Sequence, residues 1–196
     1  MEQLRRELAI GFDIAGLIPQ LGQLRIDVFH DFPYLYEGSL EYELKYLQAY
    51  THNPLSMAFC VFDGDQLVGA TTGMPLSGKS TDIQQPFIDR GLNTDEIFYF
   101  GESILLPAYR GRGIGHLFFD VREKYALENG FKVTAFCSVV RPENHPLQPT
   151  DYRPNNDFWK KRGYIEQDYC CCMSWQDRNE TGETEKELQF WTKEWK

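Results

Sequence analysis

The chain of 196 residues has no long apolar run. No segment approaches the ~20 apolar residues that a membrane-spanning helix needs. The first residues, Met1-Glu-Gln-Leu-Arg-Arg6, lack the apolar core of a secretory signal. We therefore expect a cytoplasmic protein with no membrane partner.

Positive charge is also scarce. The chain has 20 Lys and Arg against 29 Asp and Glu, which gives a formal net charge of −9. Proteins that bind nucleic acid through its phosphates present a basic face, so this balance argues against a nucleic-acid partner. An acidic surface is compatible with a cationic substrate such as an amine, although most acidic proteins are simply soluble.

Paired cysteines are missing as well. The chain has five cysteines, three of which are consecutive at Cys170-Cys171-Cys172, and no Cys-x-x-Cys spacing. Neighbouring cysteines are poor disulfide partners, and zinc sites need spaced pairs. We expect reduced thiols and no metal.

The length suits one domain, and we expect residues 1–196 to form it. Its most informative stretch is an apolar run over 97–106 that ends at Pro107 and leads into a glycine-rich turn. Glycines alternate there at Gly111, Gly113 and Gly115. This order predicts a strand, a turn and then a helix.

The segment after the turn has the apolar spacing of a buried helical stripe, at Ile114, Leu117, Phe118 and Val121. The positive end of this helix dipole faces the turn, which makes the turn a place for an anion. Arg110 and Arg112 flank the glycines and add positive charge, as a pyrophosphate site requires. The dinucleotide fingerprint does not fit, because it needs glycine where His116 stands.

The order Arg110-Gly-Arg-Gly113-Ile-Gly115, preceded by Leu105-Leu-Pro107, resembles motif A of the GNAT N-acetyltransferases. The resemblance implies an α/β fold with a six- to seven-stranded mixed sheet, splayed central parallel strands and flanking helices. It also implies that the turn binds the pyrophosphate of acetyl-CoA and that the strand before it hydrogen-bonds the pantetheine arm.

The segment 156–164 resembles motif B of the same family. Phe158, Gly163 and Tyr164 match the motif, but Trp159 stands where many members carry a tyrosine proposed to protonate the leaving thiolate. An indole cannot deliver that proton. Either another group donates it, or the thiolate leaves unassisted, as a thiol of pKa about 8.5 allows.

The two motifs give the expected coenzyme A contacts. They are Ile104, Leu105, Leu106, Arg110, Gly111, Arg112, Gly113, Ile114, Gly115, His116, Asn156 and Trp159. Backbone N–H groups near Leu105 and Leu106 are candidates for polarising the thioester carbonyl.

The resemblance implies transfer of an acetyl group to a primary amine by direct attack in a ternary complex. Glu102 is the first candidate for the general base, because an unpaired carboxylate in an apolar strand is costly to bury. The alternative is a carboxylate paired with an arginine in a structural network. His145 and Tyr152 are further acid or base candidates. Cys137 with His145 would instead give a covalent route, against the commoner case of a buried cysteine.

Two other functions remain open. One is a module that binds acyl-CoA without catalysis, which the missing tyrosine supports. The other is a P-loop phosphotransferase, because Gly73-Met-Pro-Leu-Ser-Gly-Lys-Ser80 satisfies the Walker A pattern. The sequence argues against the second, since Pro86 is expected to prevent the helix that must follow, and we expect a flexible loop with a basic tip.

The other elements follow from local patterns. In the first half of the chain we expect a strand within 4–14, helices over 15–32 and 39–50 with Ser39 as N-cap, and a hairpin of 56–62 and 66–72. In the second half we expect a strand over 131–140, a loop over 141–154, and strands over 165–175 and 187–191. A helix over 186–196 is the alternative to the last strand. The aromatic loop 31–37 is either a linker or a wall of the acceptor pocket. The acceptor is a small-molecule or peptide amine, and the resemblance alone suggests a homodimer.

Overall fold

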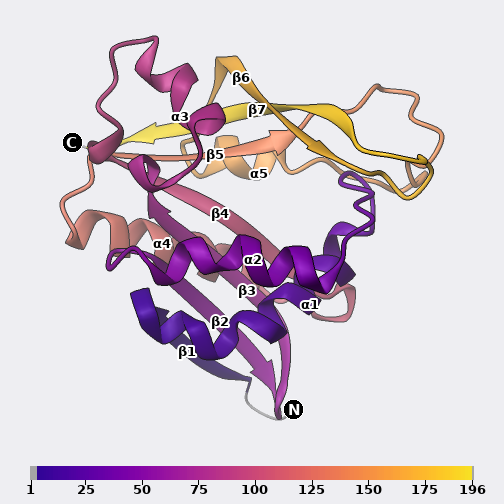
Figure 1. Cartoon of the computed structure of the whole chain (residues 1–196), viewed down its shortest axis with the longest axis horizontal. Coiled ribbons are helices and arrows are strands. Elements are labelled where there is room, and N and C mark those ends of the chain that lie inside the picture. Colours follow the sequence, from indigo (N-terminus) through magenta and orange to yellow (C-terminus); the bar gives the residue numbers. More distant parts are fainter. Residues whose placement is uncertain (1–3, 196) are drawn as a thin grey trace.

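The computed structural model describes residues 4–195, which form a seven-stranded mixed sheet flanked by helices (Figure 1). The strand order is β1-β2-β3-β4-β5-β7-β6. The strands are β1 (Arg5–Ile10), β2 (Met57–Asp63), β3 (Gln66–Pro75), β4 (Ile97–Leu105), β5 (Val133–Val139), β6 (Ile165–Trp175) and β7 (Thr184–Glu194). The helices are α1 (Ile18–Phe29), α2 (Leu40–Thr51), α3 (Thr81–Ile88), α4 (Ile114–Glu128) and α5 (Asn156–Lys161).

Strands β1 to β4 are antiparallel neighbours in chain order. The expected hairpin is confirmed: β2 and β3 pair, and Gly64 in the turn between them has φ +58°. The expected cap is confirmed too, since the Ser39 side chain accepts from the Tyr42 N–H at the start of α2.

The central strands β4 and β5 are parallel, but they pair only over Ile97–Tyr99 and Val133–Ala135. Beyond Tyr99 the two strands separate, and β5 continues beside β7. The pairing of β3 with β4 also shifts between Thr71 and Gly73, where two residues of β4, Gly101 and Glu102, lie opposite Thr72. This bulge bends β4 at the point where it leaves β5.

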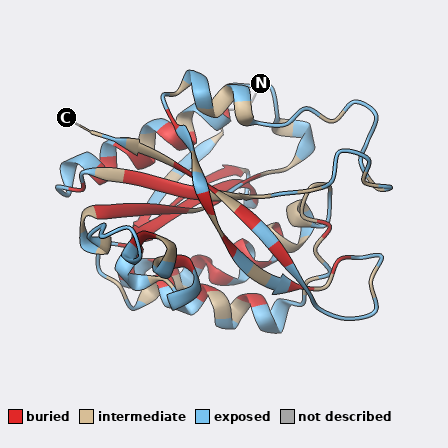
Figure 2. Cartoon of the chain, turned by 90° about the horizontal axis from the view of Figure 1, so that it is seen from above, coloured by how far each residue is buried: buried red, intermediate tan, exposed pale blue. Residues whose placement is uncertain are grey.

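Helices cover both faces of the sheet, as the alternation along β2 shows. Ala58, Cys60 and Phe62 pack in the cluster that holds α1 and α2. Met57, Phe59 and Val61 pack in the cluster of α4, since successive strand residues point to opposite faces. In Figure 2 the central strands are largely buried, and the outward faces of the flanking helices are exposed.

Some local expectations are wrong. Residues 81–88 form α3 despite Pro86, because Ile83 and Phe87 are buried in a cluster with Tyr169 of β6. The proline forgoes one N–H···O=C bond, and tertiary burial outweighs that loss. The expected strand within 4–14 is confirmed by β1, but the helix expected over 15–32 is shorter, because a 3₁₀ turn (Gly11–Leu17) precedes α1. Residues 184–194 form β7, so the helical alternative is excluded.

No helix within residues 4–195 is long and apolar enough to cross a membrane.

Candidate active site

The glycine-rich turn connects β4 to α4. A short 3₁₀ segment (Pro107–Tyr109) follows β4, and then Gly111 and Gly113 adopt left-handed backbone with φ +75° and +80°. Gly113 is the N-cap of α4, and Ile114 anchors that helix in the core. The turn depends on glycine because other residues rarely adopt these angles.

The turn has backbone N–H groups that donate to no acceptor in residues 4–195. Within residues 4–195, no backbone carbonyl accepts from the N–H groups of Gly111, Arg112 or Gly113. The first N–H groups of α4 also lack intrahelical partners. A Cβ added at Gly111, Gly113 or Gly115 would meet no atom within 4 Å, so the space above the turn is open.

The two arginines of the turn are exposed, and each donates a hydrogen bond to a backbone carbonyl that precedes it in the chain. Arg110 Nε donates to Leu105 O at 3.2 Å, and Arg112 Nη2 donates to Ala108 O at 2.9 Å. Each guanidinium keeps further N–H donors. The turn therefore has the geometry and charge of an anion site at a helix N-terminus.

The end of β4 offers backbone donors to the gap beside it. Leu106 N–H donates to Val68 O of β3 at 2.9 Å. Backbone groups alternate along a strand, so the N–H groups of Ser103 and Leu105 point the other way, where β5 has diverged. The Ile104 side chain is buried against the α1 and α2 layer, whereas Leu105 packs on the α4 side.

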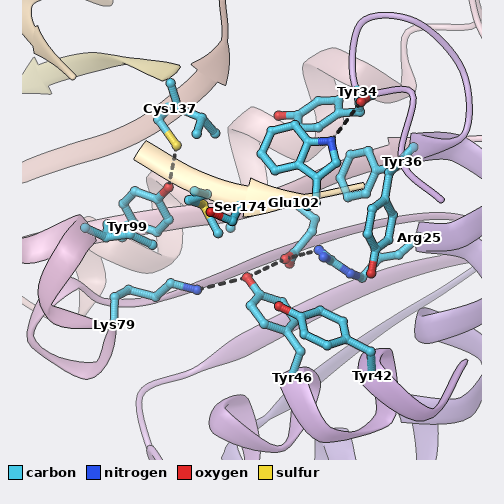
Figure 3. Close-up of a pocket in the computed structure, with 16 residues that line it drawn as sticks. Arg25, Tyr34, Tyr36, Tyr42, Tyr46, Lys79, Tyr99, Glu102, Cys137 and Ser174 are labelled. Carbon is cyan, nitrogen blue, oxygen red and sulfur yellow. Dashed lines mark hydrogen bonds and ion pairs between the residues drawn. The ribbon is translucent and has the colours of Figure 1, made fainter. Parts of the chain in front are cut away.

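A cavity of about 90 Å³ lies where β4 and β5 separate (Figure 3). Strand β4 contributes Tyr99, Gly101 and Glu102, and β5 contributes Cys137. The rest of the wall comes from α1, α2, the loop between them, β6, β7, Lys79 and Ile83. Five tyrosines line it, Tyr34, Tyr36, Tyr42, Tyr46 and Tyr99, so a large part of the wall is aromatic.

Glu102 lies at the centre of a polar network on this wall and is 3% exposed. One carboxylate oxygen accepts from Arg25 and from the Tyr46 hydroxyl at 3.2 Å. The other accepts from the Thr72 hydroxyl and from the Tyr50 hydroxyl at 3.1 Å. Arg25 also pairs with the buried Glu43, so one guanidinium bridges two carboxylates.

Burial raises the pKa of Glu102, but the charges of Arg25 and Lys79 and the hydrogen bonds from Thr72 and Tyr50 outweigh it. The pKa therefore lies below the usual glutamate range, and the carboxylate is ionised at neutral pH. Direct acceptance of a proton by Glu102 requires one of its four donors to move away.

Comparison with known proteins decides the family. Residues 23–167 match the model of the acetyltransferase (GNAT) family. The chain belongs to the GNAT acetyltransferases. A search of curated proteins gave no match.

Solved structures of GNAT enzymes share the fold at low identity. Ribosomal-protein-alanine N-acetyltransferase from Brucella melitensis is 14% identical over 96% of this chain and 99% of its own, with a TM-score of 0.60. An acetyltransferase from Thermus thermophilus is 16% identical over 100% of both chains, with a TM-score of 0.58. An aminoglycoside 6′-N-acetyltransferase complexed with coenzyme A is 17% identical over 96% of both chains, with a TM-score of 0.58.

This family membership favours catalysis over a non-catalytic acyl-CoA module. It also confirms the expected fold, whose seven-stranded sheet, splayed β4 and β5 and flanking helices the structure contains. Within residues 4–195, no group of three or more side chains is assembled that would hold a metal ion.

In this acetyltransferase the motif B helix α5 packs against β5 and β7. The Trp159 ring lies between Phe136, at 5.0 Å, and Trp191, at 5.1 Å, measured between ring centroids. Asn156 is the first residue of α5. The His116 ring contacts Phe158 at 4.8 Å, so the first turn of α4 and helix α5 lie together.

Two expected catalytic residues of the GNAT domain lie away from the cavity wall. His145 and Tyr152 pack on Phe32, with ring centroids at 5.6 and 4.7 Å. Neither lines the cavity, whereas Cys137 does. The structure therefore does not assemble the Cys137–His145 pair that a covalent route would need.

The aromatic loop between the first two helices forms part of the cavity wall, through Tyr34 and Tyr36. The loop is therefore more than a linker between the two helices, because it lines a cavity. Sequence reasoning missed the tyrosines of α2, although Tyr42, Tyr46 and Tyr50 recur every four residues and so share one helix face.

The P-loop interpretation is wrong. Gly73 to Pro75 belong to β3 and pair with β2 and β4, so these residues form no phosphate-binding loop. A Cβ at Gly73 would overlap the Phe98 ring. The expected flexible loop is also wrong, because a 3₁₀ turn (Leu76–Gly78) directs Lys79 into the cavity.

Proposed function

We propose that this acetyltransferase binds acetyl-CoA along the gap between β4 and β5 and transfers its acetyl group to a primary amine in a ternary complex. One observation carries the proposal: a turn with unused N–H donors lies at one end of β4, and an aromatic cavity lies where β4 separates from β5.

The residues present fit coenzyme A. A pyrophosphate needs several converging donors and positive charge, which Gly111 to Gly113 and the two exposed arginines supply. The outward N–H groups of Ser103 and Leu105 suit an amide-rich arm that lies alongside β4. Bound acetyl-CoA supplies the acyl group as an activated thioester.

The cavity suits the acceptor amine. Aromatic faces attract an ammonium group, and the ionised Glu102 favours it further. An amine of pKa near 10 must lose a proton before its nitrogen attacks.

We assign that proton to Glu102, with Tyr46 as the relay. The Tyr46 hydroxyl lines the cavity and donates to Glu102 at 3.2 Å. Tyr46 accepts the amine proton while it passes its own proton to Glu102. The route leaves Glu102 in place and frees the amine lone pair for attack.

The leaving thiolate needs no proton from Trp159, whose ring is packed between two aromatic side chains. A thiol of pKa about 8.5 leaves as the thiolate at neutral pH. His145 and Tyr152 have no place in this route, since neither lines the cavity.

The test compares two glycine substitutions. Gly113→Asp places a carboxylate in the turn, whereas Gly91→Asp places one at an exposed glycine with a similar φ of +70° and equally open surroundings. We expect Gly113→Asp to weaken acetyl-CoA binding about 100-fold or more, because it puts negative charge where the pyrophosphate lies. The matched control shares the backbone strain and should bind normally.

Titration calorimetry measures acetyl-CoA binding, and release of free thiol with a panel of amines measures turnover. Equal affinity of the two variants for acetyl-CoA would contradict the assignment of the turn as the pyrophosphate site. Binding of acetyl-CoA with no thiol release for any primary amine would sink the proposed acceptor class.

A further inference from the structure

Lys79 is a cation of the cavity wall that the reaction described above does not use. Its backbone follows β3 and the 3₁₀ turn Leu76–Gly78, and its ammonium lies inside the cavity (Figure 3). The Nζ atom donates to the Tyr46 hydroxyl at 3.2 Å. It also lies 5.1 to 5.5 Å from the ring centres of Tyr46, Tyr50 and Tyr99.

This ammonium lacks a direct anionic partner in the part of the chain that the structure describes. No carboxylate oxygen of residues 4–195 lies within 4.0 Å of it. A lysine has three N–H donors, and one is used here. Lys79 is half-buried, and no contacting anion offsets the partial loss of water around its ammonium.

Arg25, the other cation of the wall, already has anionic partners. It contacts both Glu43 and Glu102, and both oxygens of Glu102 already have two donors each. Neither oxygen of Glu102 is therefore left to accept from Lys79. Burial lowers the pKa of Lys79, but Tyr46 and Glu102 outweigh it and raise the pKa above its usual value, so the ammonium persists at neutral pH.

The inference rests on the proposed function and makes it narrower. We propose that the acceptor amine also carries an anionic group, a carboxylate or a phosphate, that pairs with Lys79. The amine of the acceptor then lies at the Tyr46 hydroxyl, and its anionic group lies at the Lys79 ammonium. The hydroxyl and the ammonium are 3.2 Å apart, so both groups of one small acceptor can reach them.

Charge supports this acceptor class. The charged side chains that line the cavity are Arg25, Lys79 and Glu102, and Arg25 also pairs with the buried Glu43 behind the wall, so these four charges sum to zero. A zwitterionic acceptor, such as an amino acid, keeps that balance and completes the contacts of Lys79. A polyamine would add uncompensated positive charge beside two cations.

A competing role for Lys79 is stabilisation of the oxyanion that forms when the amine attacks the thioester. That role predicts a loss of kcat for every acceptor, whatever its charge. Pairing with an anionic group of the substrate predicts a rise in KM for anionic acceptors alone.

The experiment uses acceptors in matched pairs: amino acids with their carboxamides, and O-phosphoethanolamine with ethanolamine. The variants are Lys79→Met, which keeps the length without the charge, and Lys79→Arg, which keeps the charge. Lys45→Met on the exposed side of α2 is the control for loss of one lysine. Steady-state kinetics gives kcat and KM for each pair, and calorimetry gives acetyl-CoA affinity.

We expect the wild type to prefer the anionic member of at least one pair. Lys79→Met should raise the KM of that member about tenfold or more relative to the KM of the neutral member and leave acetyl-CoA affinity unchanged, while Lys79→Arg retains part of the preference. The pair that shows the effect identifies carboxylate or phosphate.

Two results overturn the inference alone: wild-type enzyme that binds acetyl-CoA but treats both members of every pair alike, or Lys79→Met in which the ratio of the KM values of the two members stays as in the wild type. If no member of the panel is acetylated, calorimetry with coenzyme A present measures acceptor binding directly, and equal binding of acids and amides overturns it as well. Failure of the wild type to bind acetyl-CoA would instead overturn the proposed function.

Discussion

Glu102 takes its character from the residues that it meets only after folding. In the sequence it is one carboxylate in an apolar strand, where an unpaired charge is costly to bury. In the structure Arg25, 77 residues earlier, and three hydroxyl groups supply its partners. A general base and an arginine-paired carboxylate are therefore not exclusive here, because the network that holds Glu102 also contains the tyrosine that we propose as its relay.

Substituting Glu102 tests its electrostatic role through pH. Glu102→Gln leaves Arg25 with one carboxylate, and we expect it to lower the free energy of unfolding by about 3 kcal/mol at pH 7. The folded-state pKa of Glu102 is lowered, so its stabilisation is complete above the unfolded pKa of about 4.3 and is lost as pH falls through the folded pKa. Urea unfolding from pH 7 to pH 3 should show the difference between the two proteins shrinking below about pH 4.

The exposed Glu41→Gln on α2 is the control for this comparison, and we expect a change within about 0.5 kcal/mol at every pH. The relay also predicts that Glu102→Gln lowers kcat about 100-fold, since a positioned general base is worth that much. Stability at pH 7 equal to that of the wild type would contradict the network that surrounds Glu102.

At the scale of elements, the bulge in β4 determines where the cavity lies. Gly101 and Glu102 sit opposite Thr72, and Gly101 has no room for a side chain, since a Cβ there would overlap the Tyr50 hydroxyl and lie 2.6 Å from Thr72 Oγ1. Both of these groups donate to Glu102. The backbone geometry of the bulge and the hydrogen bonds to Glu102 therefore depend on each other.

Gly101→Ala should disturb both the bulge in β4 and the hydrogen bonds to Glu102. We expect it to lower the free energy of unfolding by about 2 kcal/mol and to lower kcat more than it weakens acetyl-CoA binding, because the turn lies beyond the end of β4. Chemical denaturation and steady-state kinetics measure the two effects. Gly182→Ala, at an exposed glycine with nothing within 4 Å, is the matched control and should alter neither. Normal kinetics in Gly101→Ala would show that Glu102 does not depend on the bulge.

Helix α3 makes a separate prediction. Pro86 lies inside it and lacks the N–H that would bond to the carbonyl of Asp82. Pro86→Ala restores this bond but increases the entropy of the unfolded chain, so we expect a net gain of about 1 kcal/mol in the free energy of unfolding. Thermal or urea unfolding measures it. A loss of stability would mean that the proline ring itself contributes packing that the helix needs.

These elements show which parts of the fold were predictable. The hairpin at Gly64, the cap at Ser39 and the strand, turn and helix around Gly113 rest on local chemistry, so the sequence was enough. Helix α3 depends on burial of Ile83 and Phe87 against a strand that comes 80 residues later, and no local rule contains that contact. Lys79 and Arg25 reach the cavity for the same kind of reason, because distant elements surround them.

At the scale of the molecule, two parts of the sheet meet at a narrow junction. Strands β1 to β4 form one part and β5 to β7 the other, and only three residue pairs join β4 to β5. The proposed cofactor site spans the gap beyond these pairs. A ligand that contacts both sides should therefore stabilise the whole sheet as well as the turn.

Acetyl-CoA at 100 times its dissociation constant should add about 2.7 kcal/mol of stability, which for a chain of this size corresponds to a rise of roughly 5–10 °C in Tm. Hydrogen exchange should locate the effect. We expect slower exchange at the N–H groups of Gly111, Arg112 and Gly113, which lack acceptors within residues 4–195, and also in β5 across the gap. ATP with magnesium serves as the control ligand, and Gly113→Asp as the control protein, and neither should show the shift. Protection confined to the turn, with β5 unchanged, would mean that the ligand binds at the helix N-terminus without bridging the two parts of the sheet.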